Sequence, residues 1–159
     1  PSQSSAASDV YKRQFQTWGE KHDLCKIPLP NIQDYVPETG ARKKPTPMVF
    51  FAKSSELLNF AVDKACSHFK ADPNIHANDY DAIFLHDASE YSTSRIIKKL
   101  KLDSSKVFRT HSRFGNTVSA TIPLGMDRAE QEGVLEKGMD VLLICGSAGV
   151  STGFCKFSY

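Results

Sequence analysis

Residues 82–89 read Ala-Ile-Phe-Leu-His-Asp-Ala-Ser. The first four form an apolar run, and a histidine and an aspartate follow it directly. A short continuous apolar run of this kind is typical of a buried strand. A helical pattern follows from about Ser89, so His86 is predicted to lie in a loop between a strand and a helix. In an open α/β sheet, such loops gather at the carboxyl edge of the strands, where ligands bind.

A second loop of the same kind contains Asn116, between a strand predicted at residues 106–110 and a later helix. Two neutral N–H donors that meet at one sheet edge suit an enolate or an oxyanion better than they suit hydrolysis. Each residue also has a structural explanation. A histidine that ends a strand is often a core residue, and asparagine beside Gly115 is a common turn or cap signal.

Apolar residues recur at helical spacing before the His86 loop, and a further helix is expected after the Asn116 loop. Apolar residues between 57 and 65 predict a helix with Ser54 or Ser55 as its N-cap, which ends before Pro73. A third helix is expected beyond Asn116, capped by Thr117 and bent by Pro123. Its uncharged early part, residues 118–126, is expected to be buried on more than one side, and the helix is expected to stop at Gly133.

The end of the chain predicts two strands, at residues 141–145 and 152–159, that form an antiparallel hairpin. Their connection, residues 146–149, lacks the Gly-Lys-Ser/Thr ending of a phosphate loop. It is either a tight hairpin turn or a turn that aims a backbone N–H at the site. The element order predicts an α/β fold with a mixed sheet of about four to five strands and helices on its faces.

Composition excludes several classes of protein. The chain has 159 residues, of which 40% are hydrophobic and 24% are charged. The net charge of +2 does not indicate a nucleic-acid surface, and the apolar runs are too short to indicate a membrane span. The four cysteines lack metal-ligand spacing, so no metal site is predicted, and their usage fits a reducing intracellular compartment. Cys145 and Cys155 fall in apolar strand patterns, where a thiol behaves as a small hydrophobe.

The N-terminal third differs from the rest. Residues 1–14 are small and polar, without the apolar core of a secretory signal, and are interpreted as a non-native leader. Residues 15–50 are rich in proline and are expected to form an irregular or edge-strand segment. Residues 51–159 are expected to form the main domain.

The stretch from about Phe50 to Tyr159 resembles the C-terminal half of a β-ketoacyl-acyl-carrier-protein synthase III, in the thiolase-like superfamily. Residues 115–124, GNTVSATIPL, match the asparagine motif of that family almost residue for residue. Residues 86–89, HDAS, stand where the family usually has His-Gln-Ala-Asn. Residues 147–149, with the later Gly153, stand where it has a glycine triplet and a later glycine.

The resemblance implies a decarboxylative Claisen condensation of an acyl-CoA with malonyl-acyl-carrier protein, in fatty-acid or polyketide synthesis. It assigns His86 and Asn116 as the catalytic residues that hydrogen-bond the malonyl thioester oxygen. The backbone N–H of Ala148 corresponds to an oxyanion-hole donor, and Ala88, Ser89 and Gly149 correspond to substrate-binding positions. CoA and phosphopantetheine thioesters would be substrates, with no separate cofactor.

The chain also departs from the family pattern. The nucleophilic cysteine belongs to the N-terminal half of the family, so this chain should be inactive alone. The expected partners are that N-terminal half, an acyl-carrier protein and a second copy of the protein. The expected location is the cytoplasm, or an organelle matrix or stroma. Asp87 replaces glutamine and either raises the pKa of His86 or faces away from it. Ser89 and Thr152 replace a common asparagine and tryptophan. Another thiolase-like acyltransferase, such as a hydroxymethylglutaryl-CoA synthase or a polyketide starter enzyme, and a non-catalytic acyl-binding or partner module remain alternatives.

Overall fold

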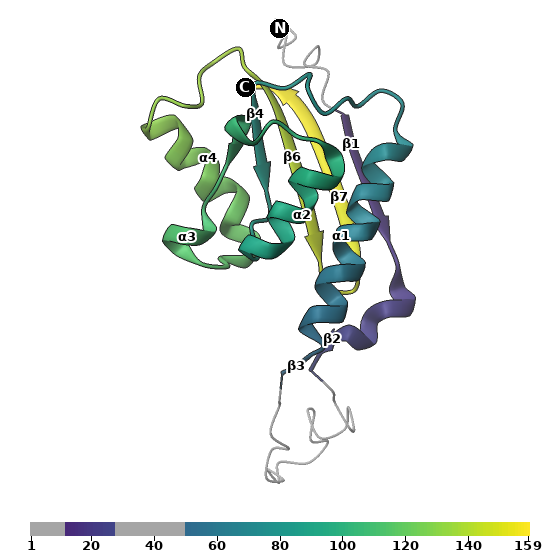
Figure 1. Cartoon of the computed structure of the whole chain (residues 1–159). Coiled ribbons are helices and arrows are strands. Elements are labelled where there is room, and N and C mark those ends of the chain that lie inside the picture. The colour runs from purple at the N-terminus through teal and green to yellow at the C-terminus, as the bar shows by residue number, and fades with distance from the viewer. Residues whose placement is uncertain (1–11, 28–49) are drawn as a thin grey trace, which may run out of the picture.

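Five strands form one mixed sheet in the order β1-β7-β6-β4-β5 (Figure 1). The strands are β1 (Lys12–Thr17), β4 (Ala82–Leu85), β5 (Val107–Phe108), β6 (Asp140–Ser147) and β7 (Ser151–Ser158). Strand β4 is parallel to its neighbours β5 and β6, whereas β7 is antiparallel to both β6 and β1. The computed structural model describes residues 12–27 and 50–159. The predicted α/β class, the mixed sheet and the final hairpin are confirmed.

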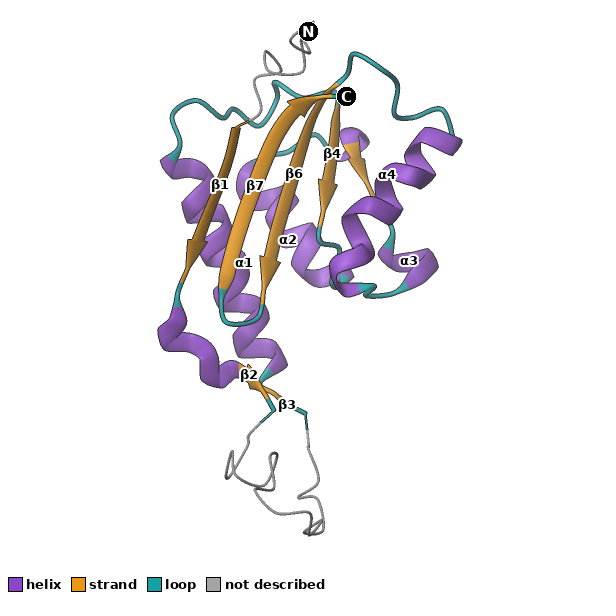
Figure 2. Cartoon of the chain, turned by 180° about the vertical axis from the view of Figure 1, so that it is seen from behind, coloured by secondary structure: helices purple, strands orange, loops and turns teal. Residues whose placement is uncertain are grey.

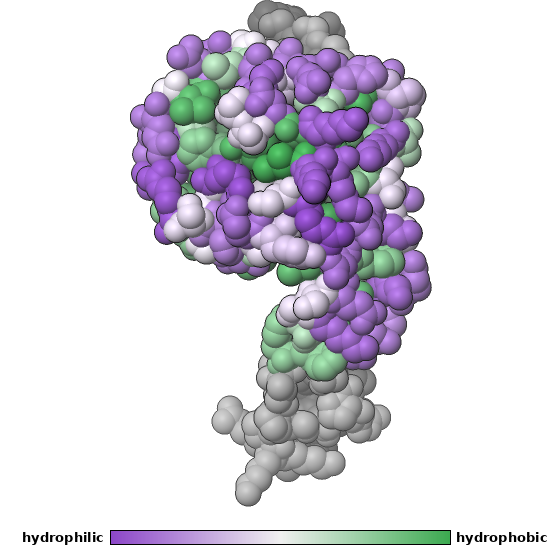
Figure 3. All heavy atoms as spheres, viewed as in Figure 1, coloured by the Kyte–Doolittle hydropathy of each residue, from purple (hydrophilic) through white to green (hydrophobic). Residues whose placement is uncertain are grey.

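Helices cover the two faces of the sheet unequally. Helices α1 (Ser54–Ala71) and α2 (Glu90–Leu100) pack on one face, and α4 (Thr121–Gln131) packs on the other face against β4. Figure 2 shows α1 and α2 behind the sheet and no described helix in front of β1, β7 and β6. Figure 3 shows the helix-covered face as mostly hydrophilic, with hydrophobic residues visible between the helices.

Residues 82–85 are buried because the two helical layers meet at β4. Ile83 and Leu85 pack into the core under α1 and α2, whereas Ala82 and Phe84 pack into the core under α4. All four are at most 3% exposed. This is the physical basis of the continuous apolar run, since alternate side chains of a strand point to opposite faces.

The two best-predicted helices differ in how they begin. Helix α2 begins where the sequence predicts, and its N-cap is Ser89, whose hydroxyl accepts the Ser92 N–H at 3.1 Å. The N-cap of α1 is Lys53 and not a serine, because Ser54 is already the first helical residue. The Lys53 N–H donates to the Leu24 carbonyl, which ties this helix start to the preceding segment.

The region from 104 to 131 differs most from the prediction. The strand is shorter than 106–110, and a short helix α3 (His111–Phe114) follows it. A single 3-10 turn (Val118–Ala120) then precedes α4, so Pro123 lies in the first turn of α4. In the first turn of a helix the backbone N–H groups have no acceptor within the helix, so a proline there removes no helical hydrogen bond. The predicted bend is wrong for this reason.

The expected burial of residues 118–126 on more than one side is also wrong. Val118 is 67% exposed, and Thr121 and Gly125 form the buried stripe. A Cβ on Gly125 would lie 3.3 Å from both the Phe84 ring and the Thr110 methyl group. The small residue therefore serves close packing of α4 on β4. The Thr117 hydroxyl, predicted as a cap, donates to the Thr121 hydroxyl at 3.1 Å instead of accepting a backbone N–H.

The N-terminal segment supplies the edge strand β1, a 3-10 helix (Gly19–Leu24) and the short ribbon of β2 (Cys25–Lys26) with β3 (Phe51–Ala52). Strand β1 includes residues 12–14, which the sequence analysis assigned to the leader. Backbone pairing is available to any residue except proline, so this pairing places those residues in the sheet without bearing on their origin. Residues 1–11 of the predicted leader, and residues 28–49, lie outside the described residues. Among the described helices, none has the length and apolar character needed to cross a membrane.

Candidate functional site

The loop after β4 holds the backbone of His86 firmly. The His86 N–H donates to the Ile144 carbonyl at 2.9 Å, which extends the pairing of β4 with β6 by one residue. The Ala88 N–H then donates back to the His86 carbonyl at 2.8 Å. His86 therefore leaves the sheet at its carboxyl edge, as the sequence predicts.

The imidazole of His86 contacts the loop that contains the asparagine motif. His86 Nδ1 lies 3.3 Å from the hydroxyl oxygen of Thr121, which also lies 2.8 Å from the Val118 carbonyl. Thr121 has a single hydroxyl proton, which it donates to the Val118 carbonyl. The enolate hypothesis requires the proton of the neutral imidazole on Nε2, from which it would donate to a substrate.

The electrostatics favour a neutral imidazole. Burial lowers the pKa of His86 below its usual value of 6.5. The Asp87 carboxylate and the backbone of Val118 raise that pKa, but burial outweighs them. A neutral imidazole at neutral pH has one N–H to donate, which is the state that the enolate hypothesis requires.

Asn116 lies in an exposed position of the adjoining loop. Its side-chain oxygen accepts the Val118 N–H at 2.9 Å, and this hydrogen bond fixes which end of the carboxamide is the donor. The Nδ2 group then has no acceptor among the described residues. Gly115 ends α3 with a φ of 68°, and Val118, a β-branched residue, has a φ of 53°. Positive φ at such a residue is strained, and strain of this kind occurs at functional sites.

The structure thus joins the two predicted loops through Thr121 and Val118. His86 contacts Thr121, Thr121 binds the Val118 carbonyl, and the Val118 N–H holds Asn116. That the imidazole and the carboxamide bind one substrate atom stays a prediction. The sequence analysis did not select Thr121, although its position five residues after Asn116 places it at the start of the next helix.

The other predicted site residues lie around the same edge. A small cavity of about 40 Å³ is lined by His86, Ala88 and Ser92 together with residues of α1, α2 and β6. Ala88 lines it directly, whereas the hydroxyl of Ser89 is already engaged in the α2 cap. Ala148 and Gly149 form the tight β6–β7 turn outside the strand pairing, and Gly149 has a φ of 120°. An oxyanion-hole role for the Ala148 N–H stays a prediction.

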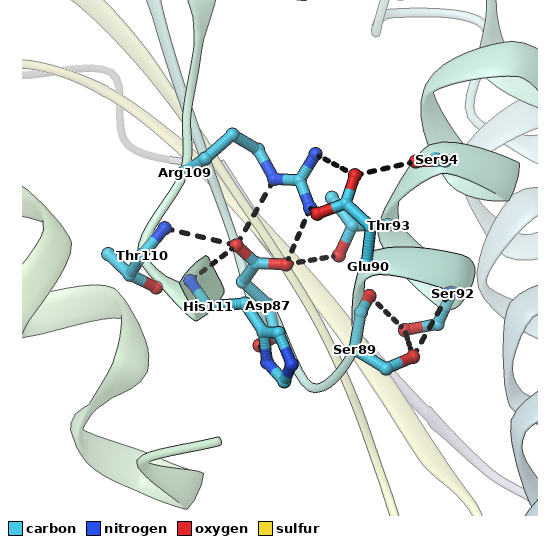
Figure 4. Close-up of polar contacts among 9 residues, drawn as sticks. All are labelled: Asp87, Ser89, Glu90, Ser92, Thr93, Ser94, Arg109, Thr110 and His111. Carbon is cyan, nitrogen blue, oxygen red and sulfur yellow. Dashed lines mark hydrogen bonds and ion pairs between the residues drawn. The ribbon is translucent and has the colours of Figure 1, made fainter. Parts of the chain in front are cut away.

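The carboxylate of Asp87 binds other segments of the protein, and its charge still raises the pKa of His86, although burial outweighs it. Its carboxylate is 1% exposed and accepts hydrogen bonds from Thr93, Arg109, Thr110 and His111 (Figure 4). Burial alone raises the pKa of Asp87, but these hydrogen bonds outweigh burial and bring the pKa to about 2. Asp87 is therefore a charged group committed to the protein scaffold.

The four cysteines are free thiols. Burial raises the pKa of Cys66, Cys145 and Cys155, so these thiols are poor nucleophiles at neutral pH. Within residues 12–27 and 50–159, no cluster of three or more His, Cys, Asp or Glu side chains could hold a metal ion.

Comparisons with known proteins identify the family. Residues 71–159 match the family described as 3-Oxoacyl-[acyl-carrier-protein (ACP)] synthase III C terminal. The chain is 36% identical over 140 residues to the beta-ketoacyl-[acyl-carrier-protein] synthase III of Blochmanniella pennsylvanica, covering 85% of this chain and 41% of that protein. It is 31% identical over 139 residues to the Chlamydia caviae protein of the same name, with the same coverage of 85% and 41%.

Solved structures share the fold. The 3-oxoacyl-(acyl carrier protein) synthase III of Pseudomonas aeruginosa superposes with a TM-score of 0.75 at 19% identity, over 92% of this chain and 43% of that chain. OleA of Xanthomonas campestris superposes with a TM-score of 0.75 at 18% identity, over 98% of this chain and 42% of that chain. The chain therefore spans less than half the length of these proteins, and it belongs to the 3-oxoacyl-[acyl-carrier-protein] synthase III family as a C-terminal part with the thiolase-like fold.

Proposed function

We propose that the chain is the C-terminal part of a condensing enzyme that joins an acyl-CoA to malonyl-acyl-carrier protein with loss of carbon dioxide. The observation that carries the proposal is the neutral, half-buried His86 beside the asparagine loop. Family membership supports the same reaction, because the curated relatives are named beta-ketoacyl-[acyl-carrier-protein] synthase III.

The chemical task of His86 and Asn116 is to stabilise an enolate. Loss of carbon dioxide from the malonyl thioester leaves a carbanion whose negative charge moves onto the thioester oxygen. A carboxamide donates at every pH, and a neutral imidazole donates from one nitrogen. Fixed donors aimed at a developing oxyanion contribute about 3–4 kcal/mol each in comparable enzymes.

Thr121 holds the imidazole of His86 in place. Its hydroxyl donates to the Val118 carbonyl at 2.8 Å, and its oxygen lies 3.3 Å from His86 Nδ1. The contact between the Thr117 and Thr121 hydroxyls, at 3.1 Å, holds the Thr121 oxygen in place. Because Thr121 is only 1% exposed, water does not compete for this hydroxyl.

The rest of the reaction needs groups that the described residues do not supply. The nucleophilic cysteine would come from an N-terminal half, and the Ala148 N–H would help to bind the oxyanion of the acylated cysteine. Ala88, Ser89 and Gly149 would lie along the pantetheine arm of the substrate. The enzyme would work as a homodimer with an acyl-carrier protein, without a separate cofactor, in the cytoplasm or an organelle matrix or stroma, and this chain alone would be inactive.

The proposal is tested in a full-length protein that contains this chain. Carbon dioxide release from malonyl-acyl-carrier protein is measured for the wild type and for His86→Ala, together with acylation of the enzyme by acyl-CoA, followed by mass spectrometry. We expect the variant to lose decarboxylation by at least a hundredfold and to keep acylation. Equal loss of both steps, or of neither, would contradict the assignment.

A further inference from the structure

Asp87 joins three segments around the candidate site. Its Oδ1 accepts from the Thr93 hydroxyl of α2 at 2.7 Å and from Arg109 Nη2 at 3.1 Å. Its Oδ2 accepts from Arg109 Nε at 3.1 Å, from the Thr110 N–H at 3.0 Å and from the His111 N–H at 2.9 Å. One carboxylate therefore ties the His86 loop to α2 and to the segment between β5 and α3 (Figure 4).

Only a carboxylate fits this set of donors. Every group around Asp87 donates, and an ionised carboxylate has only acceptor sites. A carboxamide at the same position would turn an N–H₂ group toward other donors and leave at least one of them without a partner. The side chain is buried, so water does not compensate.

Arg109 compensates the negative charge of the buried Asp87 carboxylate. Its guanidinium binds both oxygens of Asp87, and it also binds Glu90 of α2 at 2.7 and 3.2 Å. The side chain of Arg109 is 27% exposed, and that of Glu90 is 68% exposed. The negative charge next to His86 in the sequence is thus compensated within a hydrogen-bonded network that leads outward to solvent.

We propose that Asp87 and Arg109 form a positioning pair that holds the His86 loop in its working geometry and shields the imidazole from the Asp87 charge. The inference rests on the proposed function for its catalytic meaning, because it concerns the donor state of His86. Both act through the His86 loop.

The effect on His86 depends on the groups around it. Asp87 of its own loop is the charged group that acts on the pKa of the imidazole. Arg109 after β5 and His111 of α3 bind Asp87, Glu90 of α2 binds Arg109, and Cys145 of β6 lines the same cavity as His86. Removing Arg109 leaves the Asp87 charge uncompensated and should raise the pKa of His86. Removing the Asp87 charge leaves the Arg109 charge and should lower it.

The test measures the acid limb of the pH profile of malonyl decarboxylation in the full-length protein. We expect Arg109→Met to move the limb to higher pH and Asp87→Asn to move it to lower pH, each by roughly half a unit to one unit. Arg109→Lys keeps the charge but loses the fork, so it should lower kcat and leave the limb in place. Asp63→Asn is the matched control, because Asp63 also binds an arginine and a lysine, Arg95 and Lys99, but on the exposed surface of α1 and α2.

A second measurement does not depend on catalysis. Nuclear magnetic resonance follows the titration of the His86 ring and the hydrogen exchange of the Thr110 and His111 amides. We expect the same opposite shifts in the titration, and amide exchange at least tenfold faster in Asp87→Asn. If the wild-type full-length protein does not decarboxylate malonyl-acyl-carrier protein, only the proposed function is overturned. The His86 titration then still decides the role of the Asp87–Arg109 pair. Shifts in the same direction, no shift, or equal shifts in Asp63→Asn would overturn the positioning pair.

Discussion

Replacing Asp87 by Asn should destabilise the folded protein strongly and in a manner that depends on pH. The folded-state pKa of Asp87 is about 2, against an ordinary value of 3.8. One pKa unit corresponds to about 1.36 kcal/mol, so the charged form contributes about 2 kcal/mol to the free energy of unfolding. This contribution is present above pH 3.8 and is lost as the pH falls through the folded-state pKa near 2.

The substitution costs more than the charge alone at neutral pH. It leaves Arg109 without its buried partner and turns an N–H₂ group toward the Thr110 and His111 amides. Breaking one side of a buried pair costs about 3–5 kcal/mol, and the exposed contact of Arg109 with Glu90 favours the lower end of that range. We therefore expect a loss of about 3 kcal/mol at pH 7.

Urea unfolding of the wild type and the variant from pH 7 to pH 2 measures this difference. The difference in the free energy of unfolding should stay constant to about pH 5 and then shrink by about 2 kcal/mol. Other carboxyls with lowered pKa values, such as that of Asp103, cancel because they are present in both proteins. A difference that stays flat across this range, or one below 1 kcal/mol at pH 7, would refute the reasoning.

The remaining predictions concern packing, the contact between Thr121 and the imidazole, and the isolated chain. Gly125→Ala should lower the free energy of unfolding by about 1–3 kcal/mol, because the added Cβ lies 3.3 Å from Phe84 and Thr110. Thermal unfolding measures the loss. Gly19→Ala is the control, because a Cβ added at Gly19 has no atom within 4 Å. Thr121→Val removes the hydroxyl that lies 3.3 Å from His86 Nδ1 and should lower decarboxylation about fivefold, since one hydrogen bond contributes about 1 kcal/mol; decarboxylation at the wild-type rate would contradict the role of Thr121. The chain expressed alone and incubated with acyl-CoA should show no stoichiometric acyl adduct by intact-protein mass spectrometry, because burial raises the pKa of Cys66, Cys145 and Cys155; stoichiometric acylation of one of these thiols would contradict this.

The sequence predicts the elements whose signal is local. The strand at residues 82–85 and the helix start near Ser89 depend on patterns of a few residues, and both are confirmed. The loop from 111 to 120 depends on tertiary contacts instead. Its short helix, the positive φ of Val118 and the exposure of its apolar residues follow from how the chain crosses from β5 to α4, and no periodicity indicates them.

The same division applies to the candidate site. His86 and Asn116 stand out because they follow predicted strands and match a family motif. Thr121 and Arg109 are recognisable only once the fold brings residues 86–87 against residues 109–121. Asp87 shows the limit most clearly, because the sequence left its orientation open and the five hydrogen bonds that decide it come from residues 6 to 24 positions away.

The central idea is that a carboxamide and a neutral imidazole share the charge of a thioester enolate. It is tested most directly by the rate of carbon dioxide release from malonyl-acyl-carrier protein by Asn116→Ala in the full-length protein. The account predicts a loss of at least a hundredfold, with acylation by acyl-CoA largely unchanged. Decarboxylation at the wild-type rate in this variant would contradict the account.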